Sequence, residues 1–202
     1  GIHPRKAAEH HYKHALELLN NAKQEADIDF DELDGIAFSQ GPGIPQCLDV
    51  GAVIARSLSQ KHDLPLIGVN HCLSHISIGT QTTKAENPTT LYVSGGNTQI
   101  LDYRSGRYRV VGETLDIALG NALDKLARTM GYPHPGGPEI ERLAEETDDI
   151  LELSYPIKGM DLSFSGLVTE VQRRLESDSD EILANSFQEH AYSAVVEALE
   201  RA

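Results

Sequence analysis

Two histidines with the spacing of metal ligands stand directly after an apolar run. His71 and His75 lie four positions apart and follow the run Leu66–Val69. On a helix this spacing places both imidazoles on one face, where they can reach a single metal ion. The run predicts a buried strand, and ligands of α/β proteins gather at the carboxyl ends of strands. The alternative is a pair of ordinary helix histidines.

The residue after His71 argues against zinc-protease chemistry for this pair. Zinc proteases with the pattern His-Glu-x-x-His use the glutamate as a general base. Cys72 occupies that position here, so a zinc-protease interpretation lacks its base. His10 and His14 have the same spacing but lie in a long amphipathic pattern with no strand before them. An exposed or interface face is the more typical explanation for this second pair.

A glycine-rich turn is the second candidate. The run Leu91–Val93 predicts a strand that ends in Ser94-Gly95-Gly96-Asn97-Thr98, and residues 99–103 continue as a strand. The two strands are typical of a hairpin closed by the glycines. Glycines at a strand end let backbone N–H groups approach a phosphate closely. A plain hairpin turn explains the same residues without a ligand.

Acidic side chains within two glycine-containing segments form the third candidate. Asp124 follows Gly120 in the segment 112–125, and a carboxylate beside a cleft can accept the hydroxyl protons of a ribose. Its alternative is a solvated helix acid, for which Arg128 at i+4 is a candidate partner. Gly137 stands at the start of another expected helix and Glu141 in its first turns, where both can face a ligand. Acids that offset a helix dipole explain Glu141 equally well.

The elements that must position these residues alternate between helix and strand. Helical periodicity covers about 4–26, 48–61 and 116–130, and another helix begins near residue 138. Strands are expected at 35–39, 66–69, 91–93, 99–103 and 108–111, and the chain after 164–166 is mostly helical. Strands that alternate with helices predict an α/β fold.

Composition excludes several classes of protein. The 202 residues are 40% hydrophobic and 24% charged, which is typical of a globular chain and excludes wholesale disorder. No apolar run is long enough for a membrane helix. Two cysteines exclude a disulfide scaffold and indicate a reducing compartment, so we expect a cytoplasmic protein. A net charge of −14 argues against a wholly basic nucleic-acid-binding surface, although a local basic stripe remains compatible with it.

The order of these motifs along the chain resembles one family. The segments that carry the resemblance are 1–11, Ser39–Gly43, His71–His75, Val93–Thr98, Gly112–Ala118 and Pro133–Pro138. Together they are similar to the tRNA threonylcarbamoyladenosine transferases, which comprise bacterial TsaD and the catalytic subunit of the archaeal and eukaryotic KEOPS complex. The resemblance covers essentially the whole chain and looks archaeal.

This resemblance implies a fold and a reaction. The fold is the actin-like ATPase (ASKHA, ribonuclease H-like) fold, in which two lobes face a nucleotide cleft. We expect 1–111 to belong to the N-terminal lobe and 112–202 to the C-terminal lobe. The reaction transfers a threonylcarbamoyl group from threonylcarbamoyl-adenylate to the adenosine next to the anticodon, in tRNAs that read codons beginning with A. The implied partners are tRNA, a small kinase and a small dimerising subunit.

The resemblance also implies roles for individual residues. His71 and His75 would bind one divalent metal ion, iron or zinc, with Tyr92 beside it. The phosphate or acyl end of threonylcarbamoyl-adenylate or ATP would contact residues of the strand end and turn, namely Tyr92, Val93, Ser94, Gly95 and Gly96. The adenosine would be held by Asp124, Gly137 and Glu141. The nucleophile comes from the tRNA, so no nucleophilic side chain is required.

The family pattern extends beyond this sequence at both ends. The opening strands with their own phosphate loop, a further aspartate metal ligand and an asparagine adenosine contact have no counterpart here, so we expect a fragment that is inactive alone. Three other functions stay open at this point. They are a metallopeptidase, a sugar-kinase-like ATPase on the same fold, and a scaffold whose helix 4–26 docks a partner.

Overall fold

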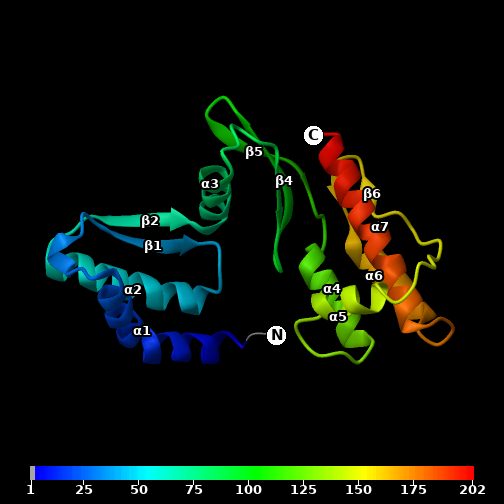
Figure 1. Ribbon diagram of the computed structural model, residues 1–202, viewed down its shortest axis with the longest axis horizontal. Helices are drawn as coiled ribbons and strands as arrows, with labels where there is room; N and C mark the ends of the chain where they lie inside the picture. Colours follow the sequence, from blue (N-terminus) through cyan, green and yellow to red (C-terminus); the bar gives the residue numbers. More distant parts are fainter. Residues whose placement is uncertain (1–2) are drawn as a thin grey trace. The chain divides into compact units, whose positions relative to one another are not determined.

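The computed structural model describes residues 3–202, which divide into two compact units, the first ending at Lys84 and the second covering Ala85–Ala202 (Figure 1). The lobe boundary expected at 111/112 lies inside a strand of the second unit. The two compact units instead meet between Lys84 and Ala85. The boundary at 111/112 refers to the lobes of a complete fold and stays a prediction. Within the described residues, no helix combines the length and apolarity that a membrane crossing requires.

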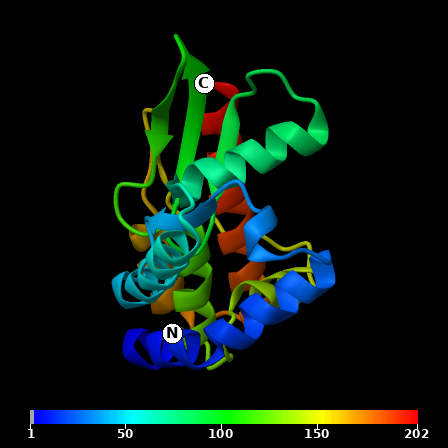
Figure 2. The same ribbon diagram turned by 90° about the vertical axis from the view of Figure 1, so that its left-hand side faces the viewer.

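The first unit is a βαβ arrangement. One helix precedes it in the chain and another follows it. Its elements in order are α1 (Pro4–Ala26), the 3-10 turn η1 (Phe30–Glu32), β1 (Ile36–Gly41), α2 (Pro45–His62), β2 (Leu66–Asn70) and α3 (His71–Thr83). β1 and β2 are parallel, with Ile36 opposite Leu66, and α2 packs against both α1 and β1 (Figures 1 and 2). Proline opens α1 and α2, where its missing N–H costs nothing.

Strand β2 corrects one expectation. The sequence predicted a buried strand, but Leu66 and Ile67 are 36% and 53% exposed. In the described residues β2 has a neighbouring strand on one side only, so apolar side chains that a wider sheet would bury remain exposed. The helix that was expected to open near Asn70 does so, because the Asn70 side chain caps α3 by accepting a hydrogen bond from the Leu73 N–H at 3.1 Å.

The second unit joins an antiparallel sheet to a group of helices. The sheet order is β3 (Thr90–Val93), β4 (Thr98–Arg104) and β5 (Arg107–Glu113). The later elements are α4 (Leu119–Thr129), α5 (Gly137–Ala144), β6 (Ile157–Lys158), β7 (Asp161–Leu162), α6 (Phe164–Arg174) and α7 (Asp180–Glu200). The β3–β4 hairpin and strand β5 confirm the sequence expectations. The short β6–β7 hairpin was not predicted, and α4 begins three residues later than expected because residues 114–118 form a loop.

The main hydrophobic core belongs to the second unit. Apolar side chains of α4, α5, α6 and α7 form one cluster, in which Leu126, Phe164, Leu167 and Phe187 are 0 to 1% exposed. Burial of such a side chain contributes about 1.5–3 kcal/mol. The helical periodicity expected near the end of the chain is confirmed, because α7 buries residues at that spacing, namely Phe187, Ala191, Ala194, Val195 and Ala198.

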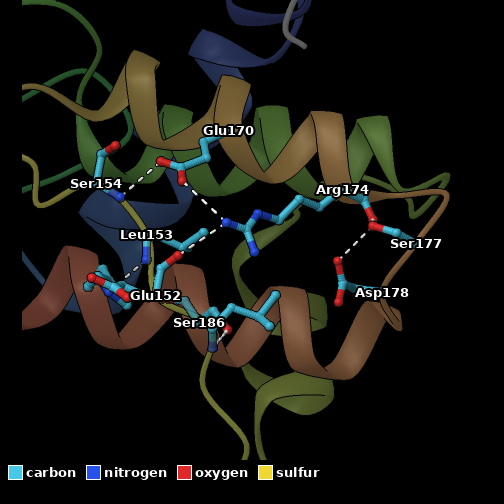
Figure 3. A network of polar contacts seen from close by, with 10 residues as sticks. Glu152, Leu153, Ser154, Glu170, Arg174, Ser177, Asp178 and Ser186 are labelled. Atoms are coloured by element: carbon cyan, nitrogen blue, oxygen red, sulfur yellow. Dashed lines mark hydrogen bonds and ion pairs between the residues drawn. The ribbon is translucent and has the colours of Figure 1, made fainter.

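Side chains of α6 and α7 hold an irregular segment between them (Figure 3). The backbone N–H of Leu151 donates to the Ser186 hydroxyl at 2.8 Å, and that of Leu153 donates to His190 Nε2 at 3.3 Å. His190 Nδ1 faces the Ser186 carbonyl at 2.7 Å, so the ring carries its proton on Nδ1. The Ser154 N–H donates to Glu170 on α6 at 2.9 Å. The backbone N–H groups of this irregular segment, which has no neighbouring strand, therefore donate to side-chain acceptors.

Candidate functional site

The histidine pair lies on the first turns of α3 in the first unit. His71 is the first residue of α3, directly after β2, and both rings are exposed. The two Nε2 atoms are 3.3 Å apart, and the ring centroids are 4.6 Å apart with an interplanar angle of 80°. The expected placement of both imidazoles on one helix face is confirmed.

This separation is compatible with a shared metal ion. Two nitrogens at about 2.0–2.1 Å from one tetrahedral ion lie about 3.3 Å from each other. The imidazoles therefore need little rearrangement to act as two ligands. In residues 3–202 no group of three or more His, Cys, Asp or Glu side chains could hold a metal ion, so the histidine pair by itself is not a complete metal site.

Burial distinguishes Cys72 and Tyr92 from the exposed histidine pair. Cys72 is half-buried and shares the inward face of α3 with Ile76, which is 4% exposed. This position agrees with a packing role for the thiol. Tyr92, the residue expected beside the metal, is 8% exposed on β3 of the second unit, opposite Gln99.

The glycine-rich turn joins β3 to β4 and packs against the start of α4. The Ser94 N–H donates to the Asn97 carbonyl at 2.8 Å, and the Ser94 hydroxyl accepts from the Asn97 N–H at 3.0 Å. A Cβ on Gly120 would lie 2.8 Å from the Ser94 carbonyl oxygen and 2.9 Å from the Gly95 Cα. The structure thus places the turn beside a helix N-terminus, a combination that favours anions. Val93, Gly95 and Gly96 are exposed there.

Asp124 on α4 holds the loop that leads into α5. Its Oδ1 accepts a hydrogen bond from the Gly136 N–H at 2.7 Å, and its Oδ2 lies 3.4 Å from His134 Nδ1. In the described residues no ion pair joins Asp124 to Arg128, and its partners are instead the Gly136 N–H and His134. Asp124 and Gly137 are brought together, because Gly136 packs directly onto the backbone of α4 at Asp124.

Glu141 follows Gly137 by one turn on α5 and is exposed. Burial raises the pKa of the Tyr192 phenol on α7, and the negative charge of Glu141 raises it further. Glu141 therefore faces the α5–α7 boundary, one turn from the start of α5. The structure therefore places Asp124 against the loop that leads to Gly137, and Glu141 one turn further along α5.

Sequence reasoning missed Asp116, which joins the 112–118 segment to α6. Its carboxylate accepts hydrogen bonds from the Ser163 hydroxyl at 2.6 Å, the Phe164 N–H at 3.0 Å and the Ser165 N–H at 3.1 Å. The Ser165 hydroxyl donates to it as well. Asp116 and Ser163 are separated by 47 positions, so no local pattern could have indicated the contact.

These hydrogen bonds keep Asp116 ionised. Partial burial raises the pKa of the carboxyl, but the donors from Ser163, Ser165 and the Ile117 N–H outweigh it and hold the pKa well below its usual value of 3.8. The carboxylate therefore caps the N-terminus of α6 from a distant loop, a role that the Ser163 side chain at the N-cap position does not perform.

Comparison with known proteins places the chain in a family. A family model described as "tRNA N6-adenosine threonylcarbamoyltransferase" (TsaD) matches residues 1–202. A protein of Methanosarcina mazei named "Probable bifunctional tRNA threonylcarbamoyladenosine biosynthesis protein" is 56% identical over all of this chain. Proteins of Thermococcus sibiricus and Thermococcus kodakarensis named "tRNA N6-adenosine threonylcarbamoyltransferase" are 50% and 51% identical over all of it.

The chain spans 38% of the length of the Methanosarcina mazei protein and 63% and 62% of the two Thermococcus proteins. A solved structure from Pseudomonas aeruginosa, described as similar to the peptidase YEAZ, is 18% identical, with 50% of this chain and 49% of that chain covered and a TM-score of 0.37. That similarity is too low to support an argument about the fold. The family model covers every residue, and the archaeal relatives are half identical throughout, so the chain belongs to the TsaD family of tRNA N6-adenosine threonylcarbamoyltransferases.

Proposed function

We propose that the protein containing this chain transfers a threonylcarbamoyl group from threonylcarbamoyl-adenylate to N6 of the adenosine next to the anticodon, in tRNAs that read codons beginning with A. The observation that carries this proposal is the match of the TsaD family model to residues 1–202. In the reaction, the adenosine amine attacks the carbamoyl carbon, the bond from that carbon to the phosphate oxygen breaks, and AMP leaves. A tRNA substrate and two free cysteines both suit the cytoplasm.

His71 and His75 are the residues that would hold a divalent metal ion, iron or zinc, with Tyr92 next to it and a further ligand from the rest of the protein. Their Nε2 separation of 3.3 Å supports this assignment. When bound, such an ion acts as a Lewis acid that polarises the carbamoyl–phosphate group. The imidazoles would hold the ion just after the carboxyl end of β2, where α/β proteins commonly bind ligands.

The second unit would supply the nucleotide contacts within an actin-like two-lobed fold. The turn residues Ser94, Gly95 and Gly96 offer backbone and hydroxyl donors beside the N-terminus of α4, which suits the phosphate or acyl end. Asp124, Gly137 and Glu141 lie near the start of α5 and would hold the adenosine. Asp124 uses one oxygen for the Gly136 N–H, and its other oxygen, 3.4 Å from His134 Nδ1, is the one that would accept a ribose hydroxyl.

A transfer assay tests the function and the metal site together. The full-length protein and its partners are given threonine, bicarbonate, ATP, the adenylate-forming enzyme and tRNA, and threonylcarbamoyladenosine is detected by mass. We expect product from the wild type and at least a roughly tenfold loss of product and of bound metal in His71→Ala. His62→Ala is the control, because His62 ends α2 and stacks on Phe30, with ring centroids 4.8 Å apart. Product that survives in His71→Ala would contradict the metal assignment, and no product from the wild type would contradict the function.

Helix α1 would dock a partner in a KEOPS-type assembly with a small dimerising subunit and a small kinase. Its apolar side chains Tyr12, Leu16 and Leu18 are 77%, 73% and 63% exposed. An apolar cavity of about 520 Å³ lies between α1, β1 and α2, with Leu18 among its lining residues. The bifunctional names of relatives such as the Methanosarcina mazei protein support a link to a second activity, for which a fused kinase is our proposal.

Leu18→Asp tests this docking surface. A buried charge in an apolar interface is costly, so we expect the dimerising subunit to be lost from the complex during size-exclusion chromatography, while bound metal is unchanged. Asn20→Asp adds the same charge at an exposed position of α1 and is the matched control. Retention of the subunit by Leu18→Asp would rule out this role for α1.

The metallopeptidase alternative is not favoured by the comparisons. The family model and the relatives are described as transferases, and Cys72 stands where a zinc protease needs its glutamate.

A further inference from the structure

The β4–β5 ribbon carries an unusual concentration of arginine. Between Asp102 and Arg109 there are three arginines and one acid, a local charge of 3 − 1 = +2, in a chain whose net charge is −14. Two tyrosines alternate with the arginines in the same segment. A cluster of basic and aromatic side chains on one element is the electrostatic pattern that nucleic-acid-binding surfaces share.

Strand register separates the two kinds of side chain onto opposite faces. Arg104 pairs with Arg107 across the ribbon, and Asp102 pairs with Arg109. Side chains opposite one another share a face, and those two apart along a strand share it as well. The three arginines and Asp102 therefore lie on one face, which we call the arginine face. Tyr103 and Tyr108 pair on the other face, with ring centroids 4.9 Å apart.

Two of these arginines have no partner within the described part of the chain. Arg104 forms an ion pair with Asp102, which is 8% exposed. The positive charge of Arg104 is therefore neutralised within the ribbon. Arg107 and Arg109 are exposed, and no ion pair or side-chain hydrogen bond in residues 3–202 involves them. Two unneutralised guanidinium groups, two residues apart, remain available to an external anion.

The ribbon holds these groups in a defined geometry. Its turn has Ser105 at φ 54° and Gly106 at φ 75°, and two consecutive positive φ values are characteristic of a tight type I′ hairpin. Figure 2 shows the turn (green) at the free end of the ribbon. Because the backbone is fixed and the tyrosine pair braces the opposite face, little main-chain entropy is lost when the arginine face binds a ligand.

We propose that the arginine face binds phosphates of the tRNA substrate. This inference rests on the proposed function and assigns a docking element to it. Guanidinium groups bind phosphate oxygens in bidentate geometry. A polyanion is repelled by a surface of net charge −14, so it approaches best where unpaired cations are concentrated. Arg107 and Arg109 would position the tRNA and carry no sequence information.

The test is the salt dependence of tRNA binding by the full-length protein in complex with its partners. Fluorescence anisotropy with a labelled tRNA transcript is measured between 50 and 200 mM salt, a range in which phosphate contacts weaken strongly (about 10³–10⁵ in affinity for 6–10 contacts). For each of Arg107→Ala and Arg109→Ala we expect affinity to fall on the order of fivefold to tenfold, and the slope of log K against log salt to decrease by about 1. Arg173→Ala removes an exposed arginine of α6 that has no ion pair or side-chain hydrogen bond within residues 3–202. It is the matched control and should leave both quantities unchanged.

Three results would overturn the proposal. The first is that both variants keep the wild-type affinity for tRNA and the wild-type salt slope. The second is that Arg173→Ala loses as much affinity for tRNA as they do. The third is that the variants lose their partner subunits, so that weaker tRNA binding reflects a broken complex. Adenylate-dependent transfer is measured in parallel with the wild type. If the wild type forms product and the two arginine variants bind tRNA as the wild type does, only the docking element is overturned. Arginine-dependent tRNA binding without product formation supports the docking element and contradicts the proposed function.

Discussion

Asp116→Ala is expected to destabilise the second unit by about 2–4 kcal/mol. The substitution removes the acceptor for the Ser163 and Ser165 hydroxyls and for the first N–H groups of α6. Loss of a helix cap costs about 0.5–2 kcal/mol, and each hydrogen bond to a charged group contributes about 1.5–3 kcal/mol without full additivity. The damage is concentrated at Phe164, a fully buried core residue whose backbone N–H is one of the donors.

The same contact predicts how stability depends on pH. The folded-state pKa of Asp116 is depressed below 3.8, so its contribution is fully present above about pH 4 and is lost as pH falls through the folded-state value. The stability difference between wild type and Asp116→Asn should therefore be constant near neutral pH and should shrink in acid. A difference that grows in acid would contradict this account.

Urea unfolding followed by circular dichroism measures the loss of stability, and hydrogen exchange of peptides that cover α6 locates it. Asp148→Ala is the control, because Asp148 is an exposed aspartate of the same unit with no side-chain hydrogen bond in the described residues, and we expect a change within about 0.5 kcal/mol. Equal effects of the two substitutions would show that the Asp116 contacts contribute nothing specific.

Gly136→Ala should be strongly unfavourable, whereas Gly137→Ala should be tolerated. A Cβ at Gly136 would lie 2.6 Å from the Ala127 Cβ and 2.9 Å from the Asp124 Cα, whereas a Cβ at Gly137 would meet only the Leu123 Cδ1 at 4.0 Å. Neither glycine has a positive φ, so the contrast comes from packing alone. Overpacking of this kind costs typically about 1–3 kcal/mol.

Gly136→Ala also tests the nucleotide site. To relieve the overlap, the 134–137 loop must move away from α4, which breaks the hydrogen bond from the Gly136 N–H to Asp124 and shifts the start of α5. We expect Gly136→Ala to bind the adenylate more weakly than the wild type in calorimetry of the full-length protein. Wild-type affinity in this variant would contradict the assignment of the Asp124 and α5 region to the adenosine.

Local patterns predicted the elements well because their causes are local. Pro4 and Pro45 open helices, Asn70 caps α3, and the glycines after Val93 close a hairpin, all through contacts within a few residues. The histidine pair was predictable for the same reason, since four residues of helix fix the relation of His71 to His75. The resemblance of ordered motifs then indicated the family, which the comparisons confirm.

Long-range contacts were not predictable in this way. The sequence could not show that Asp116 caps a helix that begins 48 positions later, or that Gly136 rests on the backbone of α4. It also placed β2 in a buried position, because the apolar run alone does not reveal how many strands lie beside it.

The sequence by itself therefore determined most of the helices and strands, the geometry of the histidine pair and the family. Only the tertiary structure decided which face of each element is buried, how Asp116 and Asp124 use their carboxylates, and which arginines lack a partner. The physical reason is the sequence separation of the contacts involved. Helix periodicity, caps and turns arise from residues that are neighbours in the chain. Burial and charge pairing depend on residues that the fold brings together from distant positions.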